Sequence, residues 1–265
     1  MILVFGSTGL LGSHLCKSFP KDVIPVTHED VDINHTYKLE RFITQIHPDV
    51  VINCAGVVRG YSVPVTYRHL TNTVAPKKMA AICEAIGIRM VHVSTDCVFD
   101  GSVGKVTEKE FPSPEDLYGS TKLKGEVVNE PHLTVRASFI GLPDRGGHGL
   151  ASWLKSQKGL NVQGYTKVKW NGMTALALAS ILVGVAYNPS ITGLRHVYCE
   201  DVSKFDVLTI LNDVYGWNCN IIPIETPVKD MRLRTVYNDI QMCHDPGTLR
   251  EQVVQMKEFF DGFTK

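Results

Sequence analysis

The sequence lacks the features that mark membrane, secreted or nucleic-acid-binding proteins. No apolar run approaches the ~18 residues needed to cross a bilayer, and neither a basic leader nor a small-residue cleavage pattern follows Met1. Charge of one sign is also absent, because 27 Lys and Arg balance 27 Asp and Glu. No net field therefore attracts nucleic acid or anionic lipid. We expect a cytoplasmic globular protein that holds any anionic ligand at a local site.

Cysteine is present without the spacing of a metal site or a disulfide framework. The seven cysteines are scattered, with no CxxC pair and no neighbouring histidine cluster. This pattern predicts reduced thiols and no bound metal. Hydrophobic residues make up 44% of the 265 residues, so the chain can bury a large core without cross-links, and intrinsic disorder is disfavoured.

Short β-branched runs alternate with longer amphipathic stretches, which is typical of βαβ units. This alternation predicts an α/β fold with a Rossmann-type, doubly wound parallel sheet. The expected strands are Ile2–Phe5, Val23–Thr27, Val50–Asn53, Met90–Val93, Thr134–Ala137 and His196–Tyr198. The expected helices are Leu10–Phe19, Tyr37–Ile46, Tyr67–Ile86, Glu115–Asn129, Leu150–Gln157, Met173–Tyr187, Lys204–Tyr215 and Thr248–Phe260.

The composition changes after Ser138, where a glycine-rich loop spans 141–149. We therefore expect a dinucleotide-binding domain over residues 1–138, with return segments at about 173–198. Residues 139–265 would form mainly a small substrate-binding lobe.

A glycine-rich turn connects the first expected strand to the first expected helix. Its glycines permit a tight turn and bring backbone amides close to a pyrophosphate, at a helix N-terminus that favours negative charge. Because the turn lies between a strand and a helix, the sequence indicates a dinucleotide site more strongly than an isolated glycine motif would. The residues expected to contact the cofactor are Gly6, Thr8, Gly9, Leu10, Leu11 and Gly12.

The second expected strand is not followed at once by the carboxylate that usually binds the adenine ribose. The nearest expected adenine contacts are Asp32 and Ile33, and no arginine for a 2′-phosphate stands beside them. NADPH and NADH therefore both remain open as cofactors. The alternative for this acidic stretch is a solvated loop.

Tyr118 and Lys122 are four residues apart in an expected helix, which places both side chains on one face. A phenol is a weak acid at neutral pH unless positive charge nearby stabilises the phenolate. Hydroxyl side chains, Thr95 among them, follow the fourth expected strand, and the carboxyl edge of parallel strands is where ligands bind.

With these motifs the sequence resembles the extended short-chain dehydrogenases/reductases, and most closely the dTDP-4-dehydrorhamnose reductase family. The matching stretches, which cover roughly the first half of the chain, are Gly6–Gly12, Asn53–Gly56, Asn72–Pro76, Ser94–Gly101, Tyr118–Glu126 and Val135–Ser138.

The resemblance implies a role for each matched residue. Tyr118 would donate a proton, Lys122 would hold the nicotinamide ribose and lower the pKa of the tyrosine, and Thr95 would bind the substrate carbonyl. Cys54, Ala55 and Gly56 would lie along the cofactor. Asn72 would support the tyrosine, or else cap or pack a helix.

The expected substrate contacts depart from the family pattern at two places. The family usually has Tyr where Cys97 stands and Trp where Phe139 stands, so the sugar need not be dTDP-linked rhamnose. Trp170 could stack on a sugar or base, or pack in the core; Arg232 could bind a diphosphate, or lie in a solvated loop. The full set of expected substrate contacts is Thr95, Asp96, Cys97, Phe139, Trp170 and Arg232.

These residues predict an NAD(P)H-dependent reductase of a nucleotide-linked 4-keto-6-deoxysugar, acting in polysaccharide or related sugar biosynthesis. Cys97 also matches a catalytic cysteine of the GDP-fucose synthases. A bifunctional 3,5-epimerase/4-reductase, with His148 on the opposite face, is therefore the first alternative. The second is a non-catalytic, dinucleotide-binding regulatory subunit like that of methionine adenosyltransferase. We expect a nucleotide-sugar ligand and a homodimer, and no nucleic-acid or membrane partner.

Overall fold

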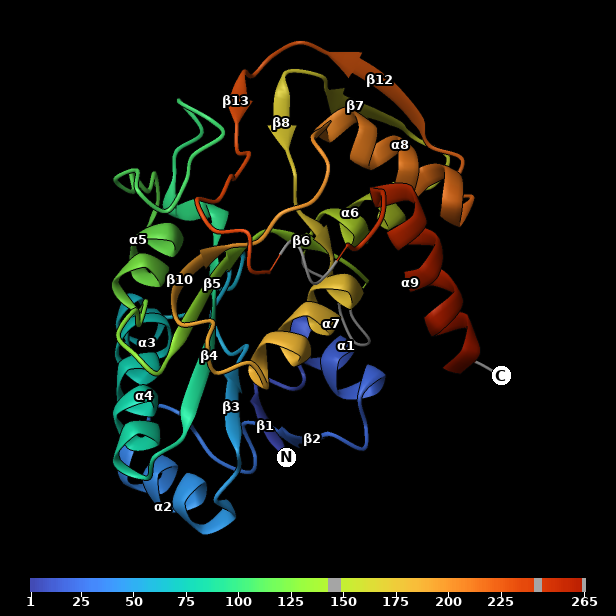
Figure 1. Ribbon diagram of the computed structural model, residues 1–265. Coiled ribbons are helices and arrows are strands. Elements are labelled where there is room, and N and C mark those ends of the chain that lie inside the picture. The colour runs from blue at the N-terminus through green and yellow to red at the C-terminus, as the bar shows by residue number, and fades with distance from the viewer. Residues whose placement is uncertain (143–148, 241–244, 264–265) are drawn as a thin grey trace.

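A six-stranded parallel sheet forms the centre of the protein in the computed structural model, which describes residues 1–142, 149–240 and 245–263 (Figure 1). The strand order is β10-β5-β4-β3-β1-β2. These strands are β1 (Ile2–Phe5), β2 (Val23–Val26), β3 (Val50–Asn53), β4 (Arg89–Thr95), β5 (Leu133–Ala137) and β10 (Gly193–His196). The predicted Rossmann-type α/β class is confirmed.

Helices cover both faces of this sheet, which explains why β1, β3, β4 and β5 are buried along their whole length. On one face α1 (Leu10–Ser18) and α7 (Ala175–Ala186) pack together over the strands, and their core includes Leu15 and Leu182. On the other face lie α2 (Thr36–Ile46) and α4 (Ala75–Ala85), with Leu39 and Met79 in a second core.

A second group of strands and helices lies toward the carboxyl end of the central sheet (Figure 1). Their buried core includes Trp170, Leu208 and Val253. The helices here are α6 (Leu150–Ser156), α8 (Lys204–Tyr215) and α9 (Leu249–Phe263). The short strands are β6 (Phe139–Ile140), β7 (Asn161–Tyr165), β8 (Val168–Trp170), β9 (Met173–Thr174), β11 (Val202–Ser203), β12 (Asn220–Ile224) and β13 (Lys229–Asp230).

Four predicted elements differ from the structure, and the fourth is the helix expected over 67–86. The helix expected over 115–129 is α5, and it covers only Leu117–Lys124. It ends at Gly125, where a Cβ would lie 1.9 Å from the backbone oxygen of Asn72, so the chain passes too close to continue with a side chain. The last sheet strand is Gly193–His196 rather than His196–Tyr198. Met173 lies in β9 instead of a helix, because Thr174 caps α7 by accepting a hydrogen bond from the amide of Ala177.

The helix expected over 67–86 is interrupted. It consists of α3 (Val65–His69), a π-helix (η1, Leu70–Val74) and α4. A π-helical turn adds a residue to the helix and is often found at functional sites. Here the turn contains Asn72, whose contacts are part of the site described next.

Candidate active site

The glycine turn after β1 closes directly against the end of β3. Gly6 has a φ of +76°, and a Cβ there would lie 2.6 Å from the backbone nitrogen of Ala55. A Cβ on Gly12 would lie 2.2 Å from the backbone oxygen of Gly6. Both neighbours are main-chain atoms, so only glycine fits. The turn lies where the order of the sheet reverses, between β1 and β3, which is the ligand-binding crevice of such folds.

The other residues of this turn divide between surface and core. Thr8 and Gly9 are exposed and Leu10 is half-buried. The amide of Gly9 donates a 3.0 Å hydrogen bond to the backbone oxygen of Gly6, which closes the turn. Leu11 packs into the core under α1, so a contact with a ligand would come from its backbone. The residues of this turn therefore fit a bound dinucleotide, because its glycines leave open a space that side chains would fill.

The carboxylate at the end of β2 comes from a residue that the sequence analysis did not single out. Asp30 accepts hydrogen bonds from the amide and the hydroxyl of Thr27, at 2.8 and 2.7 Å. Thr27 directly follows β2, so Asp30 lies at the strand end. Asp32 instead accepts a hydrogen bond from the amide of Asn34, and Ile33 packs against the core. The Thr-x-x-Asp spacing was the signal that would have indicated this turn.

At the end of β3, Cys54 and Ala55 are half-buried and Gly56 is exposed. Burial raises the pKa of the Cys54 thiol to about 12. A Cβ on Gly56 would lie 3.8 Å from the Nζ atom of Lys122. This segment therefore places the glycine turn, the loop after β3 and the amine of Lys122 next to one another.

The side chain of Lys122 is anchored on strand β4 of the central sheet. Its Nζ donates a 2.7 Å hydrogen bond to the backbone oxygen of Val93 and lies 3.4 Å from Nε2 of His92. Burial lowers the pKa of Lys122 to about 8, and it lowers the pKa of His92 well below its ordinary value. His92 in turn contacts the amide of Asn53 at 3.2 Å. The amine thus has a fixed position in a buried polar network.

Tyr118 lies one helical turn before Lys122 on α5, as predicted. Its side chain forms a hydrogen bond with that of Thr95. Burial raises the pKa of Tyr118 above its ordinary value; the nearby Cys97 and Asp96 act in the same direction, whereas Thr95 and Arg59 oppose it. In this arrangement the phenol is protonated and can donate.

Thr95, Asp96 and Cys97 form the turn that ends β4. The Thr95 hydroxyl donates to Oδ1 of Asp96 at 3.1 Å and accepts from the amide of Cys97. The Cys97 thiol lies 3.5 Å from the same carboxylate oxygen. Burial and Asp96 raise the pKa of this thiol to about 12, so it is a poor base at neutral pH.

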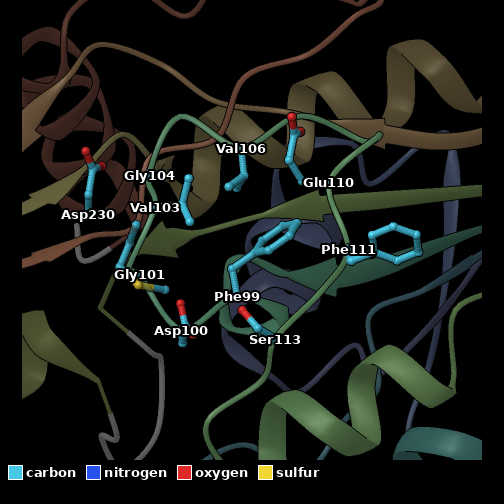
Figure 2. A pocket seen from close by; sticks show the side chains of 11 residues that line it. Phe99, Asp100, Gly101, Val103, Gly104, Val106, Glu110, Phe111, Ser113 and Asp230 are labelled. Atoms are coloured by element: carbon cyan, nitrogen blue, oxygen red, sulfur yellow. The ribbon is translucent and has the colours of Figure 1, made fainter.

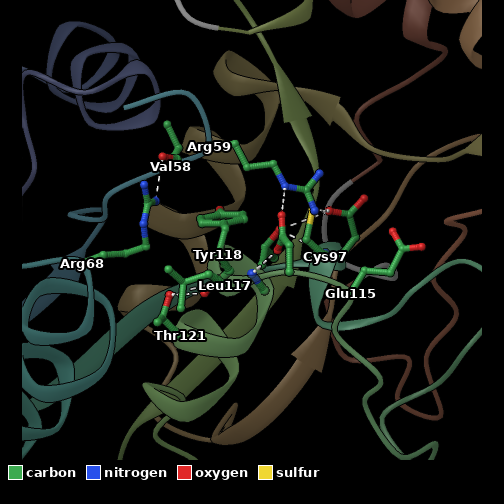
Figure 3. Close-up of polar contacts among 12 residues, drawn as sticks. Val58, Arg59, Arg68, Cys97, Glu115, Leu117, Tyr118 and Thr121 are labelled. Carbon is green, nitrogen blue, oxygen red and sulfur yellow. Dashed lines mark hydrogen bonds and ion pairs between the residues drawn. The ribbon is translucent and has the colours of Figure 1, made fainter. Parts of the chain in front are cut away.

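Arg59 is a functional candidate that the sequence analysis missed. Its Nε donates a 2.5 Å hydrogen bond to Asp116, the residue that caps α5, and its guanidinium carbon lies 5.8 Å from the centre of the Tyr118 ring. In Figure 3 the guanidinium extends toward Cys97. The only sequence signal was a basic residue in the loop after β3.

Asn72 connects two parts of the site through Val57 and Thr121. Its Oδ1 accepts from the amide of Val57, and its Nδ2 donates to the backbone oxygen of Val57 and to the Thr121 hydroxyl. The loop after β3 and helix α5 are therefore fastened to each other.

The structure does not expose every expected substrate contact. Trp170 is 1% exposed and donates from Nε1 to Ser138, so it packs in the core, which is the alternative left open above. Arg232 is engaged by Asp230 and Asp201. Phe139 is half-buried against the sheet core. His148 lies outside the described residues.

A separate pocket of about 180 Å³ lies between residues 99–113 and residues 230–231, with Phe99 and Asp230 among its lining residues (Figure 2). It does not include Thr95, Tyr118 or Lys122, and it is smaller than a usual ligand site of ~300–1,000 Å³. Across residues 1–142, 149–240 and 245–263, no helix is long and apolar enough to cross a membrane, and no three potential metal ligands form a cluster.

The sheet order, the closed glycine turn and the Tyr118–Lys122 pair beside it define an extended short-chain dehydrogenase/reductase type of α/β protein. Comparison with known proteins gives the particular family. The RmlD substrate binding domain matches residues 1–141, and the chain belongs to this family.

Individual relatives agree with this assignment. A dTDP-4-keto-6-deoxy-D-glucose reductase of Streptomyces niveus is 31% identical over 169 residues, which are 60% of this chain and 54% of the relative. The chain thus spans about half the length of the curated relatives it matches. Methionine adenosyltransferase 2 subunit beta of Rattus norvegicus is 33% identical over 138 residues, or 47% of this chain and 41% of that protein.

Solved structures share the whole fold. A dTDP-4-dehydrorhamnose reductase from Clostridium acetobutylicum superimposes with a TM-score of 0.81 at 24% identity, covering 100% of this chain and 99% of the other. The enzyme of the same name from Bacillus anthracis, solved in complex with NADP, gives 0.83 at 18% identity, with 97% and 98% covered. At these identities the likeness shows the fold alone, and the fold extends beyond the 141 matched residues.

Proposed function

We propose that the protein is an NADPH- or NADH-dependent reductase of a nucleotide-linked 4-keto-6-deoxysugar. The observation that carries this proposal is the meeting of Thr95, Tyr118 and Lys122 at the carboxyl edge of β4, beside the glycine turn. In this proposal residues 1–138 bind the cofactor and residues 139–265 mainly bind the nucleotide sugar. The names of the relatives support this substrate class.

Each residue of the trio has a distinct task in the proposed reaction. A nicotinamide dinucleotide held at the glycine turn would supply the hydride for C4 of the sugar and would be oxidised in doing so. Thr95 binds the carbonyl oxygen, and Tyr118 gives that oxygen a proton, so the ketone becomes a secondary alcohol. Lys122 holds the nicotinamide ribose and stabilises the phenolate that remains, until the phenol takes a proton from water.

The direct test is cofactor oxidation with a series of nucleotide-linked 4-keto-6-deoxysugars, using NADPH and NADH in parallel. We expect turnover with at least one sugar. Tyr118→Phe should abolish it, whereas Tyr37→Phe should not, because Tyr37 is exposed on α2. Full activity of Tyr118→Phe would remove Tyr118 from the assigned role.

The epimerase/reductase alternative depends on Cys97 acting as a base. The raised pKa of its thiol favours simple reduction. Turnover in heavy water separates the two reactions: a reductase leaves C3 and C5 of the sugar without deuterium, and an epimerase labels them.

The relatives named methionine adenosyltransferase 2 subunit beta support a second candidate, a dinucleotide-binding partner protein. Tight cofactor binding without oxidation by any ketosugar, together with a stable hetero-complex, would favour this candidate. The retention of Thr95, Tyr118 and Lys122 together favours the enzyme.

A further inference from the structure

Lys204 is the first residue of α8, and its side chain lies over the ring of Trp170 with Nζ 4.5 Å from the ring centre. Trp170 is itself buried, and it is fixed by the hydrogen bond to Ser138. Among the described residues, Lys204 Nζ forms neither a hydrogen bond nor an ion pair, and it contacts the aromatic ring of Trp170. The N–H groups of this half-buried ammonium can therefore donate hydrogen bonds to a ligand.

Folding of α8 does not explain this lysine. Ser203 and Asp206 already cap the helix reciprocally, with Ser203 Oγ accepting from the amide of Asp206 and the Asp206 carboxylate accepting from the amide of Ser203. Positive charge at a helix N-terminus is unfavourable, because the helix dipole favours anions there. Burial also disfavours the charged amine, and lowers its pKa. Both the helix dipole and burial thus disfavour a charged lysine at this position.

The Lys204–Trp170 pair lies near the end of β4. Trp170 donates to the hydroxyl of Ser138, and Ser138 directly follows Ala137, which pairs with Thr95 in the central sheet. The carboxylate of Asp96 also acts on the charge of Lys204. Asp96 directly follows Thr95, the hydrogen-bond partner of Tyr118. Lys204 therefore lies on the α8 side of the site that contains Thr95 and Tyr118.

We propose that Lys204 is a specificity-determining residue that donates a hydrogen bond to an oxygen substituent of the sugar ring, beside the carbonyl that is reduced. This inference rests on the proposed function. The sugar is the favoured acceptor because the cofactor cradle lies at Gly6, Ala55 and Gly56, on the β1–β3 side of Tyr118. The Trp170 ring orients the ammonium, and the sugar oxygen replaces the water that the half-buried amine gives up.

The experiment compares Lys204→Met and Lys204→Arg with wild type and with Lys158→Met, an exposed lysine in the same part of the chain. Three affinities are measured: for NADPH, for the nucleoside diphosphate without sugar, and for the intact nucleotide sugar in the presence of oxidised cofactor. KM and kcat are determined separately. Circular dichroism and thermal unfolding identify any variant that fails to fold.

We expect Lys204→Met to weaken binding of the nucleotide sugar by about 10- to 100-fold, the effect of losing a charged hydrogen bond, with KM rising by a similar factor. Binding of NADPH and of the nucleoside diphosphate should stay within about twofold of wild type, and Lys204→Arg should recover part of the loss. Lys158→Met should match wild type throughout.

Three results would overturn the inference. Equal losses for the nucleoside diphosphate and the nucleotide sugar would place Lys204 at the phosphates. Unchanged ligand affinities with a lowered melting temperature would make it only a packing residue on Trp170. If wild type and Lys204→Met are equally active, the proposed reductase function stands and the proposed role of Lys204 is wrong. A wild type that neither binds nor reduces any nucleotide sugar would overturn the proposed function as well.

Discussion

The Lys122 ammonium donates a 2.7 Å hydrogen bond to the backbone oxygen of Val93, in the middle of a buried strand. The contact joins the helix that carries Tyr118 to the floor of the sheet. A flexible lysine side chain is thereby held in one position, where it can serve a cofactor ribose and a neighbouring phenol without rearranging.

Tyr118→Phe tests the proton donor quantitatively. Removing a general acid typically costs about 10²- to 10⁴-fold in rate, so kcat should fall by that order while the dissociation constant for NADPH stays close to wild type. Stopped-flow single turnovers with a competent ketosugar measure the chemical step. A loss of cofactor affinity that accounts for the whole effect would contradict the assignment.

The buried amine of Lys122 predicts a pH dependence of stability. Its pKa is lowered from 10.5 to about 8, so between these values the unfolded chain holds the proton and the folded chain does not. The free energy of unfolding contributed by this group therefore rises with pH across that window and is least favourable below pH 8. Relative to Lys122→Met, wild type should gain on the order of 3 kcal/mol as pH increases from about 8 to 10.5.

Urea unfolding of the two proteins at several pH values measures this difference, because other titrating groups cancel. Two stability curves that run parallel from neutral to alkaline pH would contradict the assigned burial of the amine.

Gly6→Ala and Gly87→Ala separate a steric clash from backbone strain. Both glycines have left-handed backbone conformations, with φ of +76° and +73°, but a Cβ at Gly87 meets nothing within 4 Å. Gly87→Ala should therefore cost only about 1 kcal/mol of stability, with cofactor binding intact. Gly6→Ala should cost more and lose NADPH binding, since the added carbon meets the amide of Ala55. Calorimetric titration and thermal melts provide both readouts; equal behaviour of the two variants would exclude a special role for the turn.

Glu126→Gln tests a buried ion pair behind the site. Glu126 accepts hydrogen bonds from Arg136 through both carboxylate oxygens and from Ser94, and both members of the ion pair are nearly inaccessible. Losing the charge leaves Arg136 uncompensated, at a cost of about 3–5 kcal/mol. Asp213→Asn, which breaks the exposed pair with Arg250, should cost at most about 1 kcal/mol. Chemical denaturation of both variants gives the comparison, and similar losses would show that burial is not the deciding factor.

The parts of the fold predicted correctly from the sequence are those specified by local patterns. Strands β1 and β3 are short, buried and mainly apolar runs, and Gly6 and Gly12 occur in a turn whose spacing is itself the signal. Tyr118 and Lys122 were paired by helical periodicity alone, and the structure places both on α5.

The missed features depend on contacts between distant segments. Nothing near Arg59 in the sequence indicates that it pairs with Asp116, 57 residues later. Lys204 meets Trp170, and Asp96 acts on its charge, only after the chain beyond the sheet has folded back over the edge of β4. The close approach of Asn72 to Gly125, which requires a glycine at the end of α5, is likewise a contact between distant segments.

The π-helical turn has a consequence for redesign. Asn34, two residues beyond Asp32, donates a 3.1 Å hydrogen bond to the hydroxyl of Thr71. The next residue, Asn72, donates a hydrogen bond to the hydroxyl of Thr121 in α5. A continuous series of contacts thus connects the loop after β2 with helix α5. If the protein is the proposed reductase, loop grafts after β2 that alter its cofactor preference should preserve Asn34, because its loss would disturb the position of α5.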